Sequence, residues 1–327
     1  MDILNYLVSN ETDYQRILPL LNMTVSPNGI YIGVGADQNF TFMATTHPSF
    51  SFIIDYHPEN QYLHHLFKTC FEFAPTRQTY LSILFSKPLT PEVQNNQAVS
   101  LSELVTYFDG VESADDLFDQ NGPLIRASLN RFKPTLPDEA LDTIDRMRGL
   151  FRLHHSGLKT RLDTATWQGR PYPAYRDCLL AVDNEGRNWH FLNSNDRYAR
   201  IKKMQEQNRI IPVVGDWSGE KTLRELGAFT EKRGKTVSVL YVSNVEEFLF
   251  REGRFEAYME NIERLPVDAN SLIVRSVYDT TGRKHPLSRD EHLFTTVAQN
   301  LNQFISLFRR GCYRNYWDVA TFAYLAS

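Results

Sequence analysis

The chain has 327 residues, of which 42% are apolar and 23% are charged, and its formal net charge is -4. This length and apolar content allow a large buried core, in one elaborated domain or two small ones. Basic residues form only short, separate runs at 232–235 and 309–310, whereas a nucleic-acid partner normally requires a clustered basic surface. We therefore expect a small-molecule ligand and no nucleic-acid partner.

Cysteine usage and the absence of long apolar runs indicate the compartment. The chain has three cysteines, Cys70, Cys178 and Cys312, which lie far apart in the sequence. A small, odd number of cysteines is typical of a protein in a reducing compartment, and their spacing is not that of zinc ligands. Residues 1–5 lack the pattern of a secretion signal, and no apolar run approaches membrane-spanning length. We therefore expect a cytoplasmic protein with no membrane partner, while the composition leaves its oligomeric state open.

The first part of the chain predicts a helical lead-in followed by one half of a nucleotide-binding βαβ unit. Residues 1–24 carry apolar side chains at helical spacing. The pattern that follows predicts a strand over 29–32, a short helix over 40–45, a strand over 50–54 and an amphipathic helix over 58–74. Prolines stand where both helices are expected to end, at Pro48 and Pro75.

The next strand of buried type is Ile210–Val214, so the chain between it and the second helix is much longer than a crossover needs. We interpret residues 75–208 as a mainly helical insertion that forms a cap or substrate-facing region. Within it the sequence predicts helices over 138–154 and from Ser194 or Asn195 to about 207, and a β-hairpin of 175–182 and 188–192 that turns at 183–186.

Beyond this insertion, strands and helices alternate. Strands are predicted over 210–214, 236–242 and 271–278, helices over 220–232, 245–250 and 292–308, and a final antiparallel edge strand within 316–325. Alternation of this kind predicts a mostly parallel sheet with right-handed crossovers. We therefore expect an α/β protein whose Rossmann-like domain consists of residues 25–74 and 209–327.

Polar or glycine-containing turns follow four of the predicted strands. In an open α/β sheet, ligands bind outside the carboxyl ends of the strands, near the switch in strand order. The four turns therefore predict a nucleotide-like site. Its candidate residues are Gly33, Gly35, Asp37 and Gln38 in the first turn, Asp55 after the second strand, Asp216 and Trp217 after the third, and Ser243 and Asn244 after the fourth.

Residue types within these turns favour one kind of nucleotide. Asp55 stands 20 positions after Gly35, where an acidic residue contacts ribose hydroxyls. Gln38 replaces the third glycine of the dinucleotide fingerprint, which packs the helix closely beneath a pyrophosphate. A ligand without phosphates depends less on that helix end, so we expect S-adenosylmethionine. Asp216 is then placed for its adenine, and Trp217 for stacking on the adenine ring.

Four segments of the chain also carry a family resemblance, namely IYIGVGADQNFTF, FIIDYHPEN, VVGDWSG and YVSNVEEFLF. They resemble the signature segments of a family of uncharacterised bacterial proteins that is regarded as having a class I methyltransferase-like Rossmann fold. The resemblance extends over most of the chain and implies that fold. The glycine motif departs from that of class I methyltransferases, because Tyr31 replaces its acidic residue and Asp37 its last glycine.

Each candidate residue also has a purely structural interpretation. The glycines fit a tight turn that binds nothing, and Asp55, Asp216 and Ser243 fit helix caps. The histidine pairs 64–65 and 154–155 do not indicate a metal site, because adjacent residues on a helix point about 100° apart. Ser218 lacks the glycine spacing of a hydrolase nucleophile.

Three functional hypotheses therefore remain open. The first is a methyltransferase-like protein that binds S-adenosylmethionine and acts on a small molecule, with Ser243 and Asn244 beside the reacting groups. The second is a non-catalytic nucleotide-binding or interaction module that has kept the sheet and lost turnover. The third is a nicotinamide-dependent oxidoreductase, which the absence of glycine at Gln38 makes less favourable.

Overall fold

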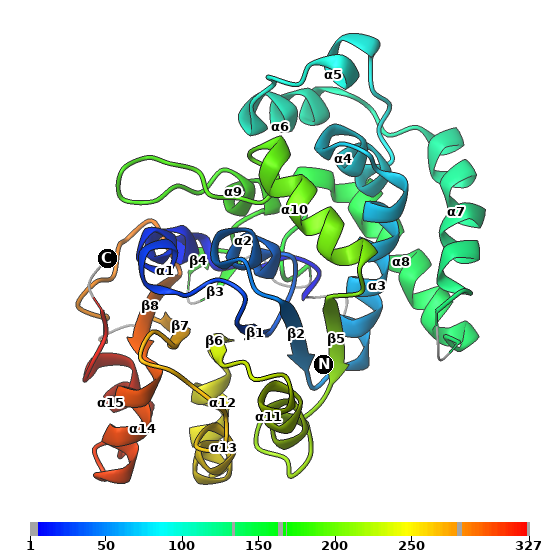
Figure 1. Ribbon diagram of the computed structural model, residues 1–327. Helices are drawn as coiled ribbons and strands as arrows, with labels where there is room; N and C mark the ends of the chain where they lie inside the picture. The colour runs from blue at the N-terminus through cyan, green and yellow to red at the C-terminus, as the bar shows by residue number, and fades with distance from the viewer. Residues whose placement is uncertain (1–5, 133–134, 163–165, 168, 280–282, 326–327) are drawn as a thin grey trace.

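A computed structural model describes residues 6–132, 135–162, 166–167, 169–279 and 283–325. In this part of the chain, a six-stranded sheet with the strand order β5-β2-β1-β6-β7-β8 forms the centre of the molecule (Figure 1). The strands are β1 (Ile30–Gly33), β2 (Phe50–Asp55), β5 (Ile210–Val214), β6 (Val237–Ser243), β7 (Leu272–Tyr278) and β8 (Phe294–Asn300).

Strand pairing confirms the predicted α/β class with a mostly parallel, Rossmann-like sheet. The pairs β5–β2, β2–β1, β1–β6 and β6–β7 are parallel, and only β7–β8 is antiparallel. Most residues of β1, β2, β6 and β7 are buried, as expected for strands with helices on both faces. The parallel order places the carboxyl ends of five strands at one edge of the sheet.

Helices cover both faces of the sheet (Figure 1). On one face lie the 3₁₀ helix η2 (Thr12–Ile17), α1 (Leu18–Thr24) and α2 (Gln38–Thr46). On the other face lie α11 (Thr222–Lys232), α12 (Val245–Arg251), α13 (Phe255–Ile262) and α14 (Leu301–Arg309), followed by α15 (Tyr316–Thr321). Aromatic contacts join both layers to the sheet: Phe42 of α2 packs on Tyr31, and Phe229 of α11 packs on Phe52.

The connection from β2 to β5 is mainly helical. It begins with α3 (Pro58–Phe73) and continues through α4 (Arg77–Phe85), α5 (Pro91–Asn95), α6 (Leu101–Gly110), α7 (Asp115–Leu129), α8 (Asp138–His154), η3 (His155–Gly157), α9 (Tyr175–Leu179) and α10 (Asn195–Glu206). Ser194 caps α10, since its hydroxyl accepts a hydrogen bond from the amide of Arg197. Helix α8 has the predicted bounds.

The predicted hairpin of 175–182 and 188–192 is wrong. Its first half contains α9, and its second half belongs to no strand. The turn itself forms, because the Asp183 carboxylate accepts hydrogen bonds from the amides of Glu185 and Arg187 and from the Trp189 indole. Hydrogen bonds to a side chain thus replace the expected strand pairing. The short strands of this region are β3 (Thr166–Trp167) and β4 (Arg170–Pro171).

Two predictions at the C-terminal end are also wrong. The helix expected over 292–308 is two elements, strand β8 and helix α14, joined at Asn300, which caps α14. The antiparallel edge strand expected within 316–325 is instead helix α15, and Leu325 forms a single bridge to Ala298. The antiparallel edge strand of the sheet is β8, whose threonines favour extended structure over helix.

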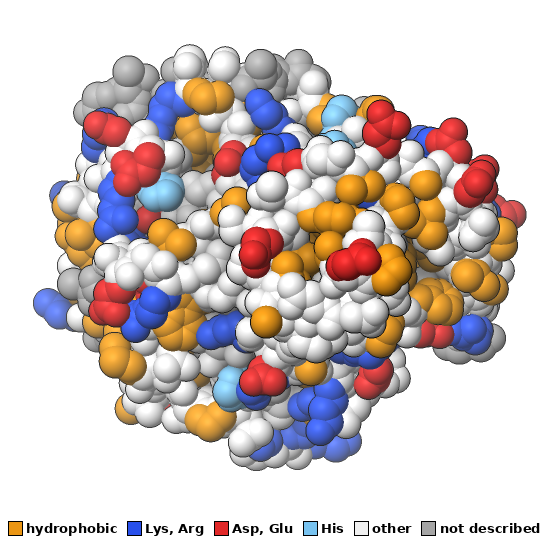
Figure 2. Space-filling view, turned by 90° about the horizontal axis from the view of Figure 1, so that it is seen from above, with side chains coloured by type: hydrophobic (Ala, Val, Ile, Leu, Met, Phe, Trp, Pro, Cys, Tyr) orange, Lys and Arg blue, Asp and Glu red, His pale blue; other side chains and the backbone are white. Residues whose placement is uncertain are grey.

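One continuous hydrophobic core joins the sheet to the long connection. Phe151 of α8 packs on Phe67 of α3, and Phe67 packs on Phe40 of α2. Basic and acidic side chains are interspersed on the face seen from the side of α5 and α6 (Figure 2). Among the helices of the described residues, none has both the length and the apolar character that a membrane span requires.

Candidate functional site

The change of direction in the strand order lies between β1 and β6. From β1 the chain passes through α2 to β2 on one side, whereas the chain after β5 returns through α11 to β6 on the other side of β1. In sheets of this kind, a ligand crevice lies outside the carboxyl ends of the strands at this switch point. The turn 33–38 and residues 243–244 stand at that position. They form the centre of the candidate site.

The turn after β1 is held closed by Asn39. Its side-chain amide donates hydrogen bonds to the carbonyl oxygens of Val34 at 2.9 Å and Ala36 at 2.7 Å, and its Oδ1 accepts one from Tyr31 at 2.7 Å. A Cβ atom at Gly33 would lie 2.2 Å from that Oδ1, and Gly35 has a φ of +87°. Both glycines are therefore required by the turn itself, before any ligand is considered.

Polar side chains surround Gly35 and leave hydrogen-bond acceptors unused. Asn60 Nδ2 and His64 Nε2 donate to the Gly35 carbonyl oxygen at 3.1 and 2.9 Å. Burial lowers the pKa of His64 to about 4, so its ring is neutral and its Nδ1 is an acceptor. Within the described structure, Gln38 Oε1, Asn60 Oδ1 and His64 Nδ1 are buried without a hydrogen-bond partner. The glycine turn is therefore bordered by acceptors that suit a ligand rich in N–H and O–H groups.

Asp37 and Gln38 connect this turn to other parts of the molecule. The Tyr175 hydroxyl, at the start of α9, donates a hydrogen bond to the Asp37 carboxylate. Burial raises the pKa of Asp37 from 3.8 to about 6. Gln38 Nε2 donates to the Tyr241 hydroxyl of β6 at 3.3 Å. Asp37 thus faces the long connection, while Gln38 bridges the switch point.

Asp55 lies beside the glycine turn, at the carboxyl end of β2. Its Oδ1 accepts a hydrogen bond from the His57 amide at 3.0 Å, and its carbonyl oxygen accepts one from Gly215 at 2.8 Å. Burial raises the pKa of Asp55, opposed by that bond from His57. The side chain is partly exposed, and ribose contact by Asp55 stays a prediction.

Asp216 and Trp217 lie farther out, after the edge strand β5. The Asp216 carboxylate accepts two bonds from Ser218, both of 2.9 Å, and forms an ion pair with Arg254. Burial alone would raise the pKa of Asp216, but the bonds from Arg254 and Ser218 lower it. Trp217 is only 4% exposed and packs near Tyr258. In this conformation the Trp217 ring is covered by protein, and its stacking on adenine stays a prediction.

Ser243 ends β6 in a left-handed conformation with a φ of 50° and meets a residue that the sequence analysis did not assign to the site. Its hydroxyl donates to the buried carboxylate of Glu11, which also accepts hydrogen bonds from the hydroxyls of Tyr241 and Ser276. Burial raises the pKa of Glu11, and these three bonds oppose the shift. Asn244 is the N-cap residue of α12 and is partly exposed. The structure therefore brings Glu11 to the same edge as the candidate catalytic residues.

The position of Glu11 in the sequence hides this role. Residues 9–12 have the composition of a helix cap, and Glu11 precedes the strands it contacts by more than two hundred positions. One signal was present, because Tyr241 and Ser276 are polar residues within mainly apolar strands. Buried polar groups of this kind need a partner, although the sequence does not say which one.

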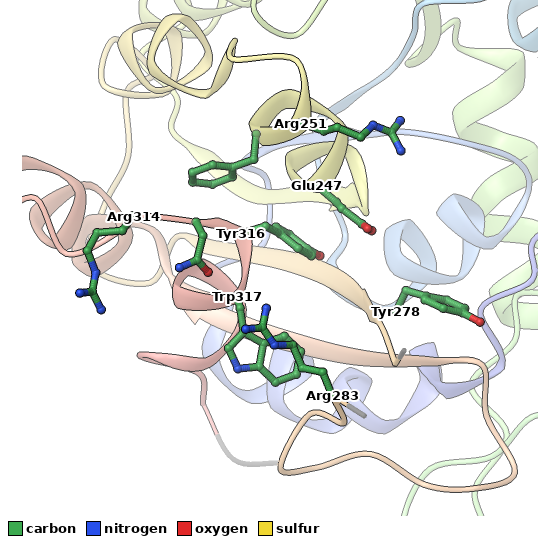
Figure 3. Close-up of a pocket in the computed structure, with 9 residues that line it drawn as sticks. Glu247, Arg251, Tyr278, Arg283, Arg314, Tyr316 and Trp317 are labelled. Atoms are coloured by element: carbon green, nitrogen blue, oxygen red, sulfur yellow. The ribbon is translucent and has the colours of Figure 1, made fainter. Parts of the chain in front are cut away.

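A hollow of about 450 Å³ lies beside α12, which follows β6, and the last residue of β7. We call it the β6–β7 pocket (Figure 3). Its lining comes from α12, from the end of β7 and the loop after it, and from α15 and the two residues before it; the residues are Glu247, Phe250, Arg251, Tyr278, Arg283, Arg314, Asn315, Tyr316 and Trp317. Of these residues, the sequence analysis assigned none to the site.

No group of three or more His, Cys, Asp or Glu side chains suited to a metal ion occurs among the residues that the structure describes.

A family model with the description "Domain of unknown function (DUF7790)" matches residues 6–95 and 139–321. The match includes every candidate site residue and the lining of the β6–β7 pocket, and it omits α6 and α7. No match was found among curated proteins.

Proposed function

Because the chain belongs to the DUF7790 family, whose description assigns no activity, we propose its function from the site alone. We propose that it binds S-adenosylmethionine at the switch point between β1 and β6 and acts as a methyltransferase-like protein on a small molecule. Sheets with this type of switch point serve many functions, so the proposal depends on the side chains rather than on the fold.

The observation that carries the proposal is the set of unused acceptors around the glycine turn. Gln38 Oε1, Asn60 Oδ1 and His64 Nδ1 are buried without a partner within the described residues. The methionine ammonium and the adenine amino group of S-adenosylmethionine would supply the missing donors. A dinucleotide fits less well, because its two phosphates would add negative charge beside Asp37 and Asp55.

The remaining candidate residues have consistent places in this arrangement. Asp55, at the end of β2, would accept hydrogen bonds from ribose hydroxyls, because its carboxylate lies beside the turn. When bound, S-adenosylmethionine would supply an electrophilic methyl group. Ser243 and Asn244, across the switch point, would position the acceptor for an in-line displacement, which depends mainly on geometry.

One contact favours the second hypothesis, a nucleotide-binding module without turnover. The Ser243 hydroxyl donates a hydrogen bond to the buried Glu11 carboxylate, so its hydrogen already has a partner within the protein. The cofactor site and the reaction can therefore be separated by experiment. Binding without methyl transfer to any acceptor would support the module, and binding of NAD or NADP in preference would support the oxidoreductase.

Calorimetric titration with S-adenosylmethionine, S-adenosylhomocysteine, NAD and NADP tests the proposal. We expect both adenosyl ligands to bind with one site per chain. Asp55→Asn keeps an oxygen for the His57 amide and removes the charge, so we expect it to weaken adenosyl binding by about tenfold.

The matched control is Glu231→Gln, which removes a charge from the exposed end of α11 and should leave affinity unchanged. An absence of heat and of thermal stabilisation with both adenosyl ligands would refute the proposed cofactor. If wild type and Asp55→Asn bind the adenosyl ligands with equal affinity, only the proposed role of Asp55 is refuted.

We also place the protein in the cytoplasm as part of this proposal. Cys70, Cys178 and Cys312 are all free thiols, and Cys70 and Cys178 are buried. Unpaired cysteines are typical of reducing compartments. Fractionation of cells that produce the tagged protein tests this placement.

A further inference from the structure

We propose that the β6–β7 pocket binds a small aromatic carboxylate. Its volume of about 450 Å³ is in the range of small-molecule sites, and its lining combines arginines with aromatic rings. The side chains come from three separate parts of the chain, namely α12, the end of β7 with Arg283, and α15.

The charges that line the pocket favour an anion. Arg251 and Arg283 form no ion pair among the described residues, and each lies over an aromatic ring, Phe248 at 4.6 Å and Trp317 at 5.1 Å. Arg314 is paired outside the pocket with Asp318 at 3.4 Å. Glu247 contributes one negative charge. The excess of positive charge is therefore small, which suits a singly charged carboxylate better than a phosphate dianion.

The walls of the pocket favour a flat ring on the same ligand. Tyr278, Tyr316 and Trp317 all line the hollow, and in Figure 3 Arg283 lies against Trp317. Aromatic faces stack well on planar groups, and this stacking adds affinity beyond that of the area they bury. A saturated ring of the same size and charge would lose this contribution.

Glu247 gives the pocket a hydrogen-bond acceptor. In Figure 3 its carboxylate is directed between Tyr316 and Tyr278, and burial raises the pKa of Glu247, opposed by Arg251. A ligand hydroxyl or amino group would donate to this carboxylate, while the ligand's own carboxylate faces the arginines. The site therefore selects an aromatic carboxylate that carries a proton donor away from its acid group.

Glu247 of the pocket lies in the first turn of α12, whose N-cap residue is Asn244, so the ligand of the pocket would be the methyl acceptor. That role depends on the proposed function, whereas binding itself does not. The test accordingly measures binding without any nucleoside. The probes are benzoate, 4-hydroxybenzoate, cyclohexanecarboxylate, methyl benzoate and phenyl phosphate, each titrated calorimetrically into the full chain.

We expect saturable binding in the order 4-hydroxybenzoate, benzoate, cyclohexanecarboxylate, with methyl benzoate weakest because it lacks the charge. Arg251→Gln and Arg283→Gln should each weaken benzoate binding by about tenfold. Glu247→Ala should abolish the advantage of 4-hydroxybenzoate and leave benzoate equal or tighter. Trp317→Leu should abolish the preference for benzoate over cyclohexanecarboxylate.

The control for charge is Arg200→Gln, an exposed arginine of α10, which should leave all affinities unchanged. Thermal unfolding of each variant verifies that it is folded. Binding that is equal in Arg251→Gln and wild type, tighter binding of phenyl phosphate than of benzoate, or no binding of any probe would each overturn the inference. If the adenosyl ligands bind and the aromatic carboxylates do not, only the inference about the β6–β7 pocket is refuted. If the aromatic carboxylates bind and the adenosyl ligands do not, only the proposed cofactor is refuted.

Discussion

At the scale of single residues, Asp37 links the candidate site to the pH dependence of stability. Its carboxylate is buried in the glycine turn, accepts a hydrogen bond from Tyr175, and has its pKa raised by burial from 3.8 to about 6. Between these two pH values the folded protein binds more protons than the unfolded chain. The free energy of unfolding therefore falls as the pH rises through this window.

We predict that Asp37→Asn removes this dependence, because an amide keeps an acceptor for Tyr175 but does not titrate. We compare the free energies of unfolding as wild type minus variant. This difference should fall by about 1–3 kcal/mol from about pH 4 to about pH 6. Urea unfolding at several pH values measures the difference. Burial also raises the pKa of Asp13 to about 6. Asp13 is present in both proteins, so its contribution cancels in the difference between their free energies of unfolding. Parallel stability curves would contradict the prediction.

At the scale of elements, a buried ion pair joins α12 to β7 beneath the β6–β7 pocket. Arg275 Nε lies 2.6 Å from Glu246 Oε2, and both side chains are 0% exposed. Arg275 also donates to Gln299 of β8 at 2.9 Å, and Tyr258 of α13 donates to Glu246 at 3.3 Å. These bonds fix α12, which carries Glu247 and Arg251, against the sheet. Loss of either partner leaves an uncompensated buried charge.

We predict that Arg275→Met and Glu246→Gln each reduce the free energy of unfolding by about 3–5 kcal/mol. The double variant should be destabilised by clearly less than the two single effects added together, because it leaves no unpaired charge. A double-mutant cycle by urea unfolding measures the coupling. The exposed pair Arg309–Glu263, at 2.8 Å, is the control, and its coupling should be about 0–1 kcal/mol. Additive effects at the buried pair would contradict the interpretation.

At the scale of the whole molecule, the long connection between β2 and β5 shares one core with the sheet. Phe151, Phe67 and Phe40 pack in series from α8 to α2, and all three are fully buried. Tyr175 adds a hydrogen bond from α9 to the glycine turn. We therefore expect residues 75–208 to unfold together with the Rossmann-like sheet.

We predict a single thermal transition whose calorimetric and van't Hoff enthalpies agree. Phe151→Ala should destabilise the protein by about 3–5 kcal/mol and shift that transition as a whole, although the substitution lies in the connection. Differential scanning calorimetry measures both quantities. Two resolved transitions, of which the variant shifts only one, would show that the connection is an independent domain.

The sequence alone was sufficient for the class of fold and for much of its local structure. Runs of apolar residues predicted β1, β2, β5, β6 and β7. For β1, β2, β6 and β7 the reason is that a strand buried on both faces needs apolar side chains at nearly every position. The helices α2, α3, α8 and α10 were equally clear from periodicity and caps. Glycine and acidic residues after these strands predicted a ligand site at the carboxyl edge of the sheet, and that site stays a prediction.

Only the tertiary structure decided what those turns contact. Ser243 meets Glu11, Asp37 meets Tyr175 and Asp216 meets Arg254, and each pair is distant in the sequence. Such pairings depend on which elements pack together, which no local pattern encodes. For the same reason, the hairpin at 175–192 and the helix at 292–308 were wrong, since their propensities were weak and tertiary packing outweighed them. The β6–β7 pocket likewise exists only because α12, β7 and α15 meet in the folded chain.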